Sequence, residues 1–105
     1  MSWIQVVETR RIPRDRGLRV NIGEHRIALF RIGDDVYAIG DRCSHAEASL
    51  SEGDLFDYEV ECPRHGSAFD VRTGEPQALP ATQPVPTYDV KVEDDVVFLE
   101  IGELT

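Results

Sequence analysis

Two short segments of the chain each place a cysteine near a histidine. Residues 43–45 read Cys-Ser-His and residues 62–65 read Cys-Pro-Arg-His, so both pairs fall within a window of 23 residues. They use both cysteines of the chain and two of its three histidines. Thiolate and imidazole are side chains that bind zinc, iron and copper. The pattern C-x-H…C-x2-H therefore predicts a metal site. Its expected ligands are Cys43, His45, Cys62 and His65.

The mixed composition of each pair bears on the choice of metal. Structural zinc usually takes two thiolates from one tight turn, whereas each segment here offers one thiolate and one imidazole. Mixed pairs suit a binuclear iron–sulfur centre in which two cysteines hold one iron and two histidines hold the other. A zinc-binding module without redox activity remains an alternative on these residues alone.

At these residues the chain resembles the Rieske family of 2Fe-2S proteins. The sequences CSH at 43–45 and CPRHGS at 62–67 match the two ligand loops of that family, and the Pro-rich segment LPATQPVP at 79–86 matches its third loop. The resemblance covers essentially the whole chain. It implies one 2Fe-2S cluster per chain, with the two thiolates on one iron and the two imidazoles on the other. It also implies that the imidazole edges face outward and form the electron exit.

Departures from the family pattern indicate a subclass. High-potential members carry a further cysteine in each loop, joined as a disulfide, and Ala48 and Arg64 stand at those positions. Those members also place a Tyr where this chain has Phe69, and the Tyr hydroxyl is a lever on the potential. Ser67 is retained; it either donates a hydrogen bond to the cluster or caps the turn at Gly66. The resemblance therefore implies a low-potential, soluble ferredoxin.

The elements that position these loops are expected to be strands. Short runs rich in Val, Ile, Leu, Phe and Tyr are separated by Gly and Asp, which predicts β-strands joined by tight turns. The predicted strands span residues 3–9, 18–22, 26–32, 35–40, 87–92 and 96–101. In the fifth strand, alternation predicts that Tyr88, Val90 and Val92 face the core. A helical period is not sustained over ten residues anywhere, and only residues 47–54 suggest a short turn. The predicted fold class is all-β.

Residues 41–75 separate the two β regions and hold both Cys/His pairs. At 105 residues the chain is long enough for one modest core, so we expect a single domain. Its β base comprises residues 1–40 and 76–105, and residues 41–75 form a cluster-binding insertion. The resemblance implies an antiparallel β-sandwich or barrel-like base. Residues 79–86 are interpreted as a rigid connector or, alternatively, as a stiff flap over the site.

Charge and hydrophobicity limit the partners. The net charge is −9, which disfavours nucleic acid and anionic membranes. Residues 1–40 carry a net +2, residues 41–75 a net −6 and residues 76–105 a net −5. The acids of the insertion serve solubility or form a docking face for a basic protein. The first residues hold no long apolar run behind a basic start, which argues against a signal peptide, and no stretch approaches the roughly 20 apolar residues needed to span a bilayer. We therefore expect a cytoplasmic protein with no membrane partner.

The resemblance implies a one-electron carrier and not an enzyme acting on an organic substrate. Similar proteins pass electrons from an NAD(P)H-dependent flavin reductase to a terminal Rieske oxygenase in aromatic hydrocarbon catabolism. The alternative is a Rieske-like small subunit of a larger reductase, such as assimilatory nitrite reductase. We expect a monomer. A sequence motif for nucleotide binding is absent, because no G-x-G-x-x-G follows a predicted strand.

Other residues have simpler interpretations. His25 is expected to be a solvated turn residue, because no second ligand accompanies it. Leu50 and Pro63 form either an apolar collar for a partner or ordinary loop packing.

Overall fold

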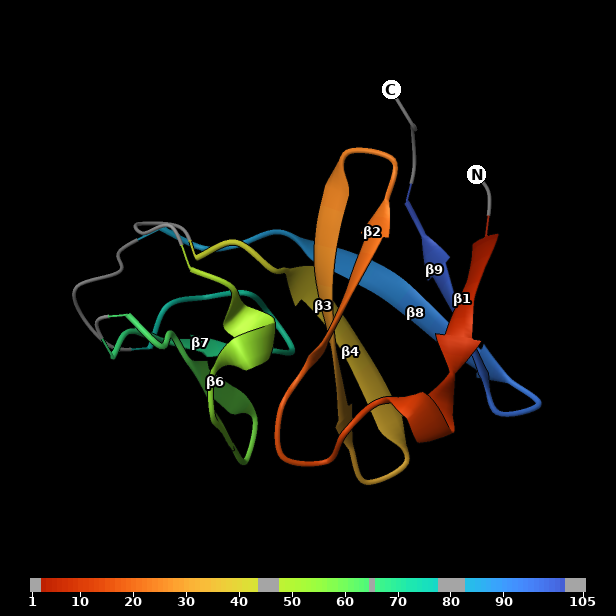
Figure 1. The fold of residues 1–105 in the computed structure, drawn as a ribbon, viewed down its shortest axis with the longest axis horizontal. Coiled ribbons are helices and arrows are strands. Elements are labelled where there is room, and N and C mark those ends of the chain that lie inside the picture. Colours follow the sequence, from red (N-terminus) through yellow and green to blue (C-terminus); the bar gives the residue numbers. More distant parts are fainter. Residues whose placement is uncertain (1–2, 44–47, 65, 78–82, 102–105) are drawn as a thin grey trace.

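The computed structural model describes residues 3–43, 48–64, 66–77 and 83–101. Within these ranges the chain folds into one large and one small antiparallel sheet (Figure 1). The large sheet contains β1 (Trp3–Glu8), β2 (Leu18–Ile22), β3 (His25–Ile32), β4 (Asp35–Gly40), β8 (Thr87–Glu93) and β9 (Val96–Glu100). The small sheet contains β5 (Leu55–Phe56), β6 (Glu59–Glu61) and β7 (Ala68–Asp70). The all-β prediction is confirmed.

The six predicted strands are all present, and each agrees with the observed strand to within one residue at either end. A 3-10 turn, η2 (Leu50–Glu52), falls inside the predicted turn at residues 47–54. A second one, η1 (Thr9–Arg11), and the short strands of the small sheet were not predicted. Strands of two or three residues are too short for a period of two to be recognised in the sequence.

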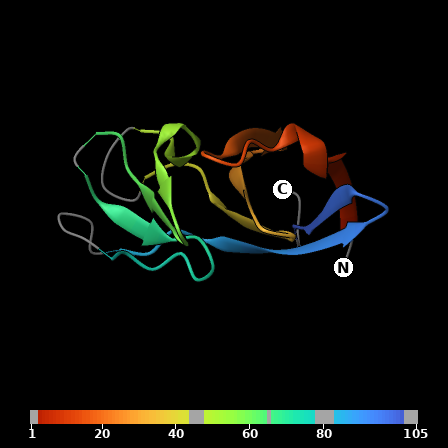
Figure 2. The same ribbon diagram turned by 90° about the horizontal axis from the view of Figure 1, so that it is seen from below.

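The large sheet has the strand order β1-β9-β8-β4-β3-β2, which leaves β1 and β2 as its edges. Seen from below, the sheet curls around the core as an open ring (Figure 2), so the barrel-like base is confirmed. The small sheet, with the order β5-β6-β7, lies beside this ring. No helix in the described part of the chain is long and apolar enough to cross a membrane.

Strand β3 separates two hydrophobic cores. Ile27 and Leu29 face one cluster, the base core, whereas Ala28 and Phe30 face a second cluster that we call the junction core. All four side chains are fully buried. Burial on both faces explains why this strand reads as a continuous apolar run instead of alternating with polar residues. The buried residues of the base core are Ile12, Ile27, Leu29, Val36, Ala38, Val97, Leu99 and Ile101. Those of the junction core are Ala28, Phe30, Ile39, Cys43, Leu50, Val60, Cys62, Phe69, Val71 and Val85. The junction core fastens the small sheet and the cysteine loops to the base.

The described end of the Pro-rich segment is bound to both parts of the molecule. The Val85 amide donates to the Gly74 carbonyl at 2.9 Å, and the Gly40 amide donates to the Pro86 carbonyl at 2.8 Å. Gly74 has a φ of +78°, and a Cβ there would lie 2.2 Å from the Val85 carbonyl oxygen. A side chain at this position would therefore force the two segments apart. Residues 79–82 lie outside the described residues.

One detail of the predicted alternation in β8 is wrong. Tyr88 and Val90 are half-buried as expected, but Val92 is 39% exposed. Lys91 is half-buried instead, because its ammonium lies 4.8 Å from the centre of the Trp3 ring and 5.6 Å from that of Phe98. These two rings make cation–π contacts with the ammonium and cover part of the lysine side chain on the surface of the large sheet.

Candidate metal centre

The two cysteine loops are each closed by an equivalent backbone hydrogen bond. The Cys43 amide donates to the Ala48 carbonyl at 3.0 Å, and the Cys62 amide donates to the Ser67 carbonyl at 2.5 Å. In each case the acceptor lies five positions after the cysteine. The second loop is tightened by a bond from the Gly66 amide to the Cys62 carbonyl at 3.2 Å, with Gly66 at a φ of +75°. Each loop thus returns to its cysteine.

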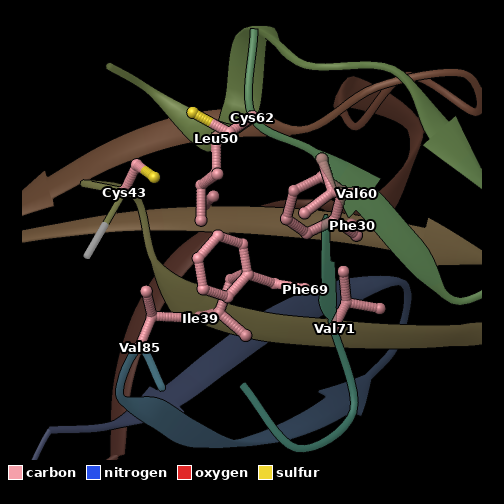
Figure 3. Close-up of a cluster of buried hydrophobic side chains, with 10 residues drawn as sticks. Phe30, Ile39, Cys43, Leu50, Val60, Cys62, Phe69, Val71 and Val85 are labelled. Carbon is pink, nitrogen blue, oxygen red and sulfur yellow. The ribbon is translucent and has the colours of Figure 1, made fainter. Parts of the chain in front are cut away.

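The two thiols are buried at one end of the junction core. Cys43 is 3% exposed and Cys62 is 1% exposed. Figure 3 shows Cys62 above Leu50 and Cys43 to the left of Leu50, with the other labelled side chains of the cluster below and to the right. The two cysteines come from different elements, since Cys43 follows β4 and Cys62 follows β6 directly. No disulfide joins these two described residues. The fold therefore brings together two soft donors that are 19 positions apart, which suits iron or zinc.

His45 and His65, the other two predicted ligands, lie outside the described residues. The described residues contain no group of three or more His, Cys, Asp and Glu side chains that could hold a metal. That set omits both histidines, so the four-ligand site stays a prediction. The two cysteine thiols are chemically suited to half of a mixed thiolate and imidazole centre.

A buried carboxylate holds the base of the first loop. Asp41 is fully buried, and its Oδ1 accepts the Ser51 amide at 2.9 Å. Its Oδ2 lies 3.3 Å from the Arg26 guanidinium, which also donates to Ser49 Oγ at 3.0 Å. The backbone of Asp41 accepts the Leu50 amide at 2.6 Å. The residues before Cys43 and those after Ala48 are thereby clamped to strand β3.

Asp41 and Arg26 were missed at the level of the sequence. A single Asp before a cysteine and a single Arg in a predicted strand carry no local signal of pairing, because they are 15 positions apart. Their pairing follows from the β3–β4 register, in which Ile27 lies opposite Gly40. Only the strand pairing could have indicated this contact.

A glycine allows η2 to approach the small sheet. A Cβ on Gly53 would lie 1.9 Å from the Glu61 carbonyl oxygen. The Glu61 amide donates to the Asp54 carbonyl at 2.9 Å in the same region. Because Glu61 precedes Cys62, this contact links the segment after the first loop to the start of the second.

A cluster of charged and aromatic side chains lies at the β5–β6 turn. Arg72 donates to both carboxylate oxygens of Asp70, at 3.1 and 2.9 Å, and its guanidinium lies 4.1 Å from the centre of the Tyr58 ring. The Arg72 hydrogen bond holds the pKa of Asp70 below its ordinary value. Tyr58 packs edge-on against Tyr37, with ring centres 6.0 Å apart, and burial raises the pKa of Tyr37.

The remaining residues named from the sequence have mixed outcomes. Leu50 is fully buried in the junction core, which agrees with ordinary packing and not with an exposed collar, whereas Pro63 is exposed. Phe69 is fully buried, and Ser67 is buried with its carbonyl closing the second loop. The prediction that His25 is a solvated turn residue is wrong, because the ring is half-buried and its Nδ1 lies 3.1 Å from the Tyr88 hydroxyl.

Comparison with known proteins identifies relatives along the whole chain. The family model of the Rieske [2Fe-2S] domain matches residues 2–89. A 3-phenylpropionate/cinnamic acid dioxygenase ferredoxin subunit from Shigella boydii serotype 4 (strain Sb227) is 43% identical over 104 residues. This match covers 98% of the chain and 97% of the relative.

Solved structures agree with the sequence relatives. The ferredoxin of carbazole 1,9a-dioxygenase from Nocardioides aromaticivorans IC177 superposes with a TM-score of 0.89 at 37% identity, covering 94% of this chain and 97% of that one. A chain in the complex of reduced oxygenase and oxidized ferredoxin in carbazole 1,9a-dioxygenase superposes with a TM-score of 0.85 at 40% identity. That match covers 92% of this chain and 91% of the other.

A further neighbour bears on the alternative function. A putative nitrite reductase NADPH small subunit superposes with a TM-score of 0.83 at 25% identity, covering 95% of this chain and 99% of that one. The fold is therefore shared by both functional classes, and the higher identity lies with the dioxygenase ferredoxins.

Proposed function

The chain belongs to the family of Rieske [2Fe-2S] domains, and we propose that Cys43, His45, Cys62 and His65 hold its cluster. The observation that carries this assignment is the pair of buried thiols at one end of the junction core, each at the start of a loop closed by the same hydrogen bond. His45 and His65 follow these cysteines by two and three positions. The division into a β base at 1–40 and 76–105 and a cluster-binding insertion at 41–75 is part of the same proposal.

The protein is a Rieske ferredoxin and works as a one-electron carrier of a dioxygenase system. The 2Fe-2S cluster supplies the one-electron redox chemistry. The contribution of the chain is to hold the centre with two thiolates instead of four. Two ferric ions, two sulfides and two thiolates would sum to zero charge, so this ligation would give a higher reduction potential than a centre held by four cysteines.

The partners follow from the role of the relatives. A terminal oxygenase receives the electron, as the solved complex of a similar ferredoxin with its oxygenase suggests. An NAD(P)H-dependent flavin reductase supplies it. We place this exchange in the cytoplasm, with the ferredoxin as a monomer. The acidic balance of residues 41–105 suits basic docking surfaces on these partners.

The alternative is a small subunit of a nitrite-type reductase. It draws support from the shared fold with the putative nitrite reductase small subunit. The lower identity of that neighbour and the presence of all four predicted ligands favour the ferredoxin. Single-turnover transfer to a terminal oxygenase supports the ferredoxin, whereas tight copurification with a large reductase subunit supports the alternative.

The cluster assignment is tested on the purified protein. We expect a red-brown colour, two irons and two sulfides per chain, and a reduced-state electron paramagnetic resonance signal of low average g. A colourless protein with one zinc per chain would contradict the assignment and support the zinc module. Replacing Cys43 or Cys62 by Ser should abolish the cluster, whereas replacing His25 should not.

A further inference from the structure

The outer face of the small sheet displays an aromatic side chain. Phe56 is 61% exposed, the largest exposed fraction among the large apolar side chains of the described residues. It pairs with Glu59 across the β5–β6 hairpin, while Leu55 and Val60 pair on the side that faces the junction core. Since side chains alternate between faces, Phe56, Glu59 and Glu61 share the solvent side. We call these three residues the outer face.

The β5–β6 hairpin, which carries Phe56, is held in place by contacts of its turn. Its two-residue turn contains Tyr58, whose ring lies 4.1 Å from the Arg72 guanidinium and 6.0 Å from the Tyr37 ring. Arg72 is itself held by the carboxylate of Asp70. The turn also contains Asp57, which adopts a φ of +55°, a conformation that costs a non-glycine residue free energy. These contacts hold the hairpin in one position, so little ordering entropy is lost when Phe56 is buried by a partner.

Exposed acidic residues lie near Phe56 along the chain and across the hairpin. Glu59 and Glu61 are exposed on the same face, and the exposed Asp54 and Asp57 flank strand β5. An apolar anchor with acidic residues nearby complements a basic protein surface with an apolar recess. The same arrangement would be repelled by nucleic acid or by an anionic membrane.

The outer face is close to the second cysteine loop. Strand β6 runs from Glu59 to Glu61 and leads directly into Cys62, a path of about 10 Å at about 3.3 Å per residue. Figure 1 shows the hairpin at one end of β6 and the cysteine loop at the other. A standard interface covers about 800 Å² on each partner, which is wide enough to span both features.

We propose that the outer face of the small sheet is a second contact surface for the terminal oxygenase, with Phe56 as its apolar anchor. The inference rests on the proposed function, because it requires an oxygenase that accepts electrons from this chain. The oxygenase is chosen over the reductase because a similar ferredoxin forms a solved complex with its oxygenase. The surface adds affinity and orientation to contacts at the cluster loops.

The test uses the variant Phe56→Ser with the matched control Val92→Ser. Val92 is also an exposed apolar residue, at 39%, but it lies near the end of β8 in the base. Each cluster-loaded protein is reduced with dithionite and mixed with an oxidised terminal Rieske oxygenase that the wild-type protein reduces, and the second-order rate is followed by stopped flow. We expect about a tenfold lower rate for Phe56→Ser and less than a twofold change for Val92→Ser. The visible spectrum and midpoint potential of both variants should equal those of the wild type.

Two charge-reversal variants test the role of the acidic residues near Phe56. Glu59→Lys should slow transfer to the oxygenase and weaken its dependence on ionic strength, whereas Glu93→Lys, an equal charge change in the base, should alter both much less.

A rate for Phe56→Ser within twofold of wild type overturns the proposal. Slower reduction by the flavin reductase with unchanged transfer to the oxygenase overturns the choice of occupant. Loss of a dimer on substitution would assign the face to self-association instead. A wild-type protein that carries no cluster, or that reduces no oxygenase, would refute the proposed function itself.

Discussion

The Arg26 guanidinium lies 3.3 Å from the carboxylate of Asp41, and this ion pair joins strand β3 to the base of the first cysteine loop. Asp41 is fully buried, whereas the Arg26 side chain is 40% exposed. The carboxylate also accepts the Ser51 amide, so both ends of the loop depend on it. Cys43 is positioned by a contact that involves neither a metal nor another cysteine.

Asp41→Asn should therefore destabilise the protein and loosen the first loop. The substitution keeps the shape but removes the charge that pairs with Arg26. Loss of a charge-assisted contact at this partly exposed pair should cost about 1–3 kcal/mol in the free energy of unfolding. Chemical denaturation and the iron content after purification measure the effect. Asp54→Asn, at an exposed position, is the control, and equal stability of the two variants would contradict the role of Asp41.

The Asp70–Arg72 pair predicts an acid-sensitive contribution to stability. The pKa of Asp70 is lowered in the folded protein, first by its hydrogen bond with Arg72. The carboxylate therefore stabilises the fold above its unfolded pKa of about 4, and this contribution is lost as the pH falls through the lower folded value. The stability difference between wild type and Asp70→Asn should be largest near neutral pH and shrink below pH of about 4. Urea unfolding across this range measures it, and a difference independent of pH would contradict the assignment.

Replacing His45 by Cys should lower the reduction potential if the cluster survives. A third thiolate adds negative charge to the centre and opposes the incoming electron. The shift should be toward the potentials of centres held by four cysteines, about −400 mV, from the Rieske range of about −150 to +300 mV. A redox titration with His25→Cys as the control checks this. An intact cluster at an unchanged potential would count against His45 as a ligand.

Phe69→Tyr should raise the potential. Phe69 is fully buried in the junction core, which also contains both cysteines. The family resemblance implies that a hydroxyl here donates to a ligand sulfur, and such a bond stabilises the reduced centre. The matched control is Phe56→Tyr on the exposed outer face, which should leave the potential unchanged. A destabilised Phe69→Tyr protein with an unaltered potential would mean that the hydroxyl is buried without a partner.

Local pattern in the sequence was enough to predict the strands of the base and the donor types of the candidate centre. The runs at residues 18–22 and 35–40 coincide with β2 and β4, because strand propensity and turn residues act over a few neighbouring positions. Cys43 and Cys62 could be identified as candidate metal ligands from residue type and spacing, since the affinity of a thiolate for metals is a property of the side chain itself.

Tertiary structure decided which side chains are buried and which are paired. His25 meets Tyr88 across 63 positions, and Leu50 enters the junction core instead of facing a partner. Phe56 has the same residue type as the buried Phe69, yet it faces solvent because it pairs with Glu59 on the outer face, whereas Phe69 pairs with Val60 on the face toward the junction core. These outcomes depend on strand register and on contacts between segments far apart in the chain, which composition and local period do not encode.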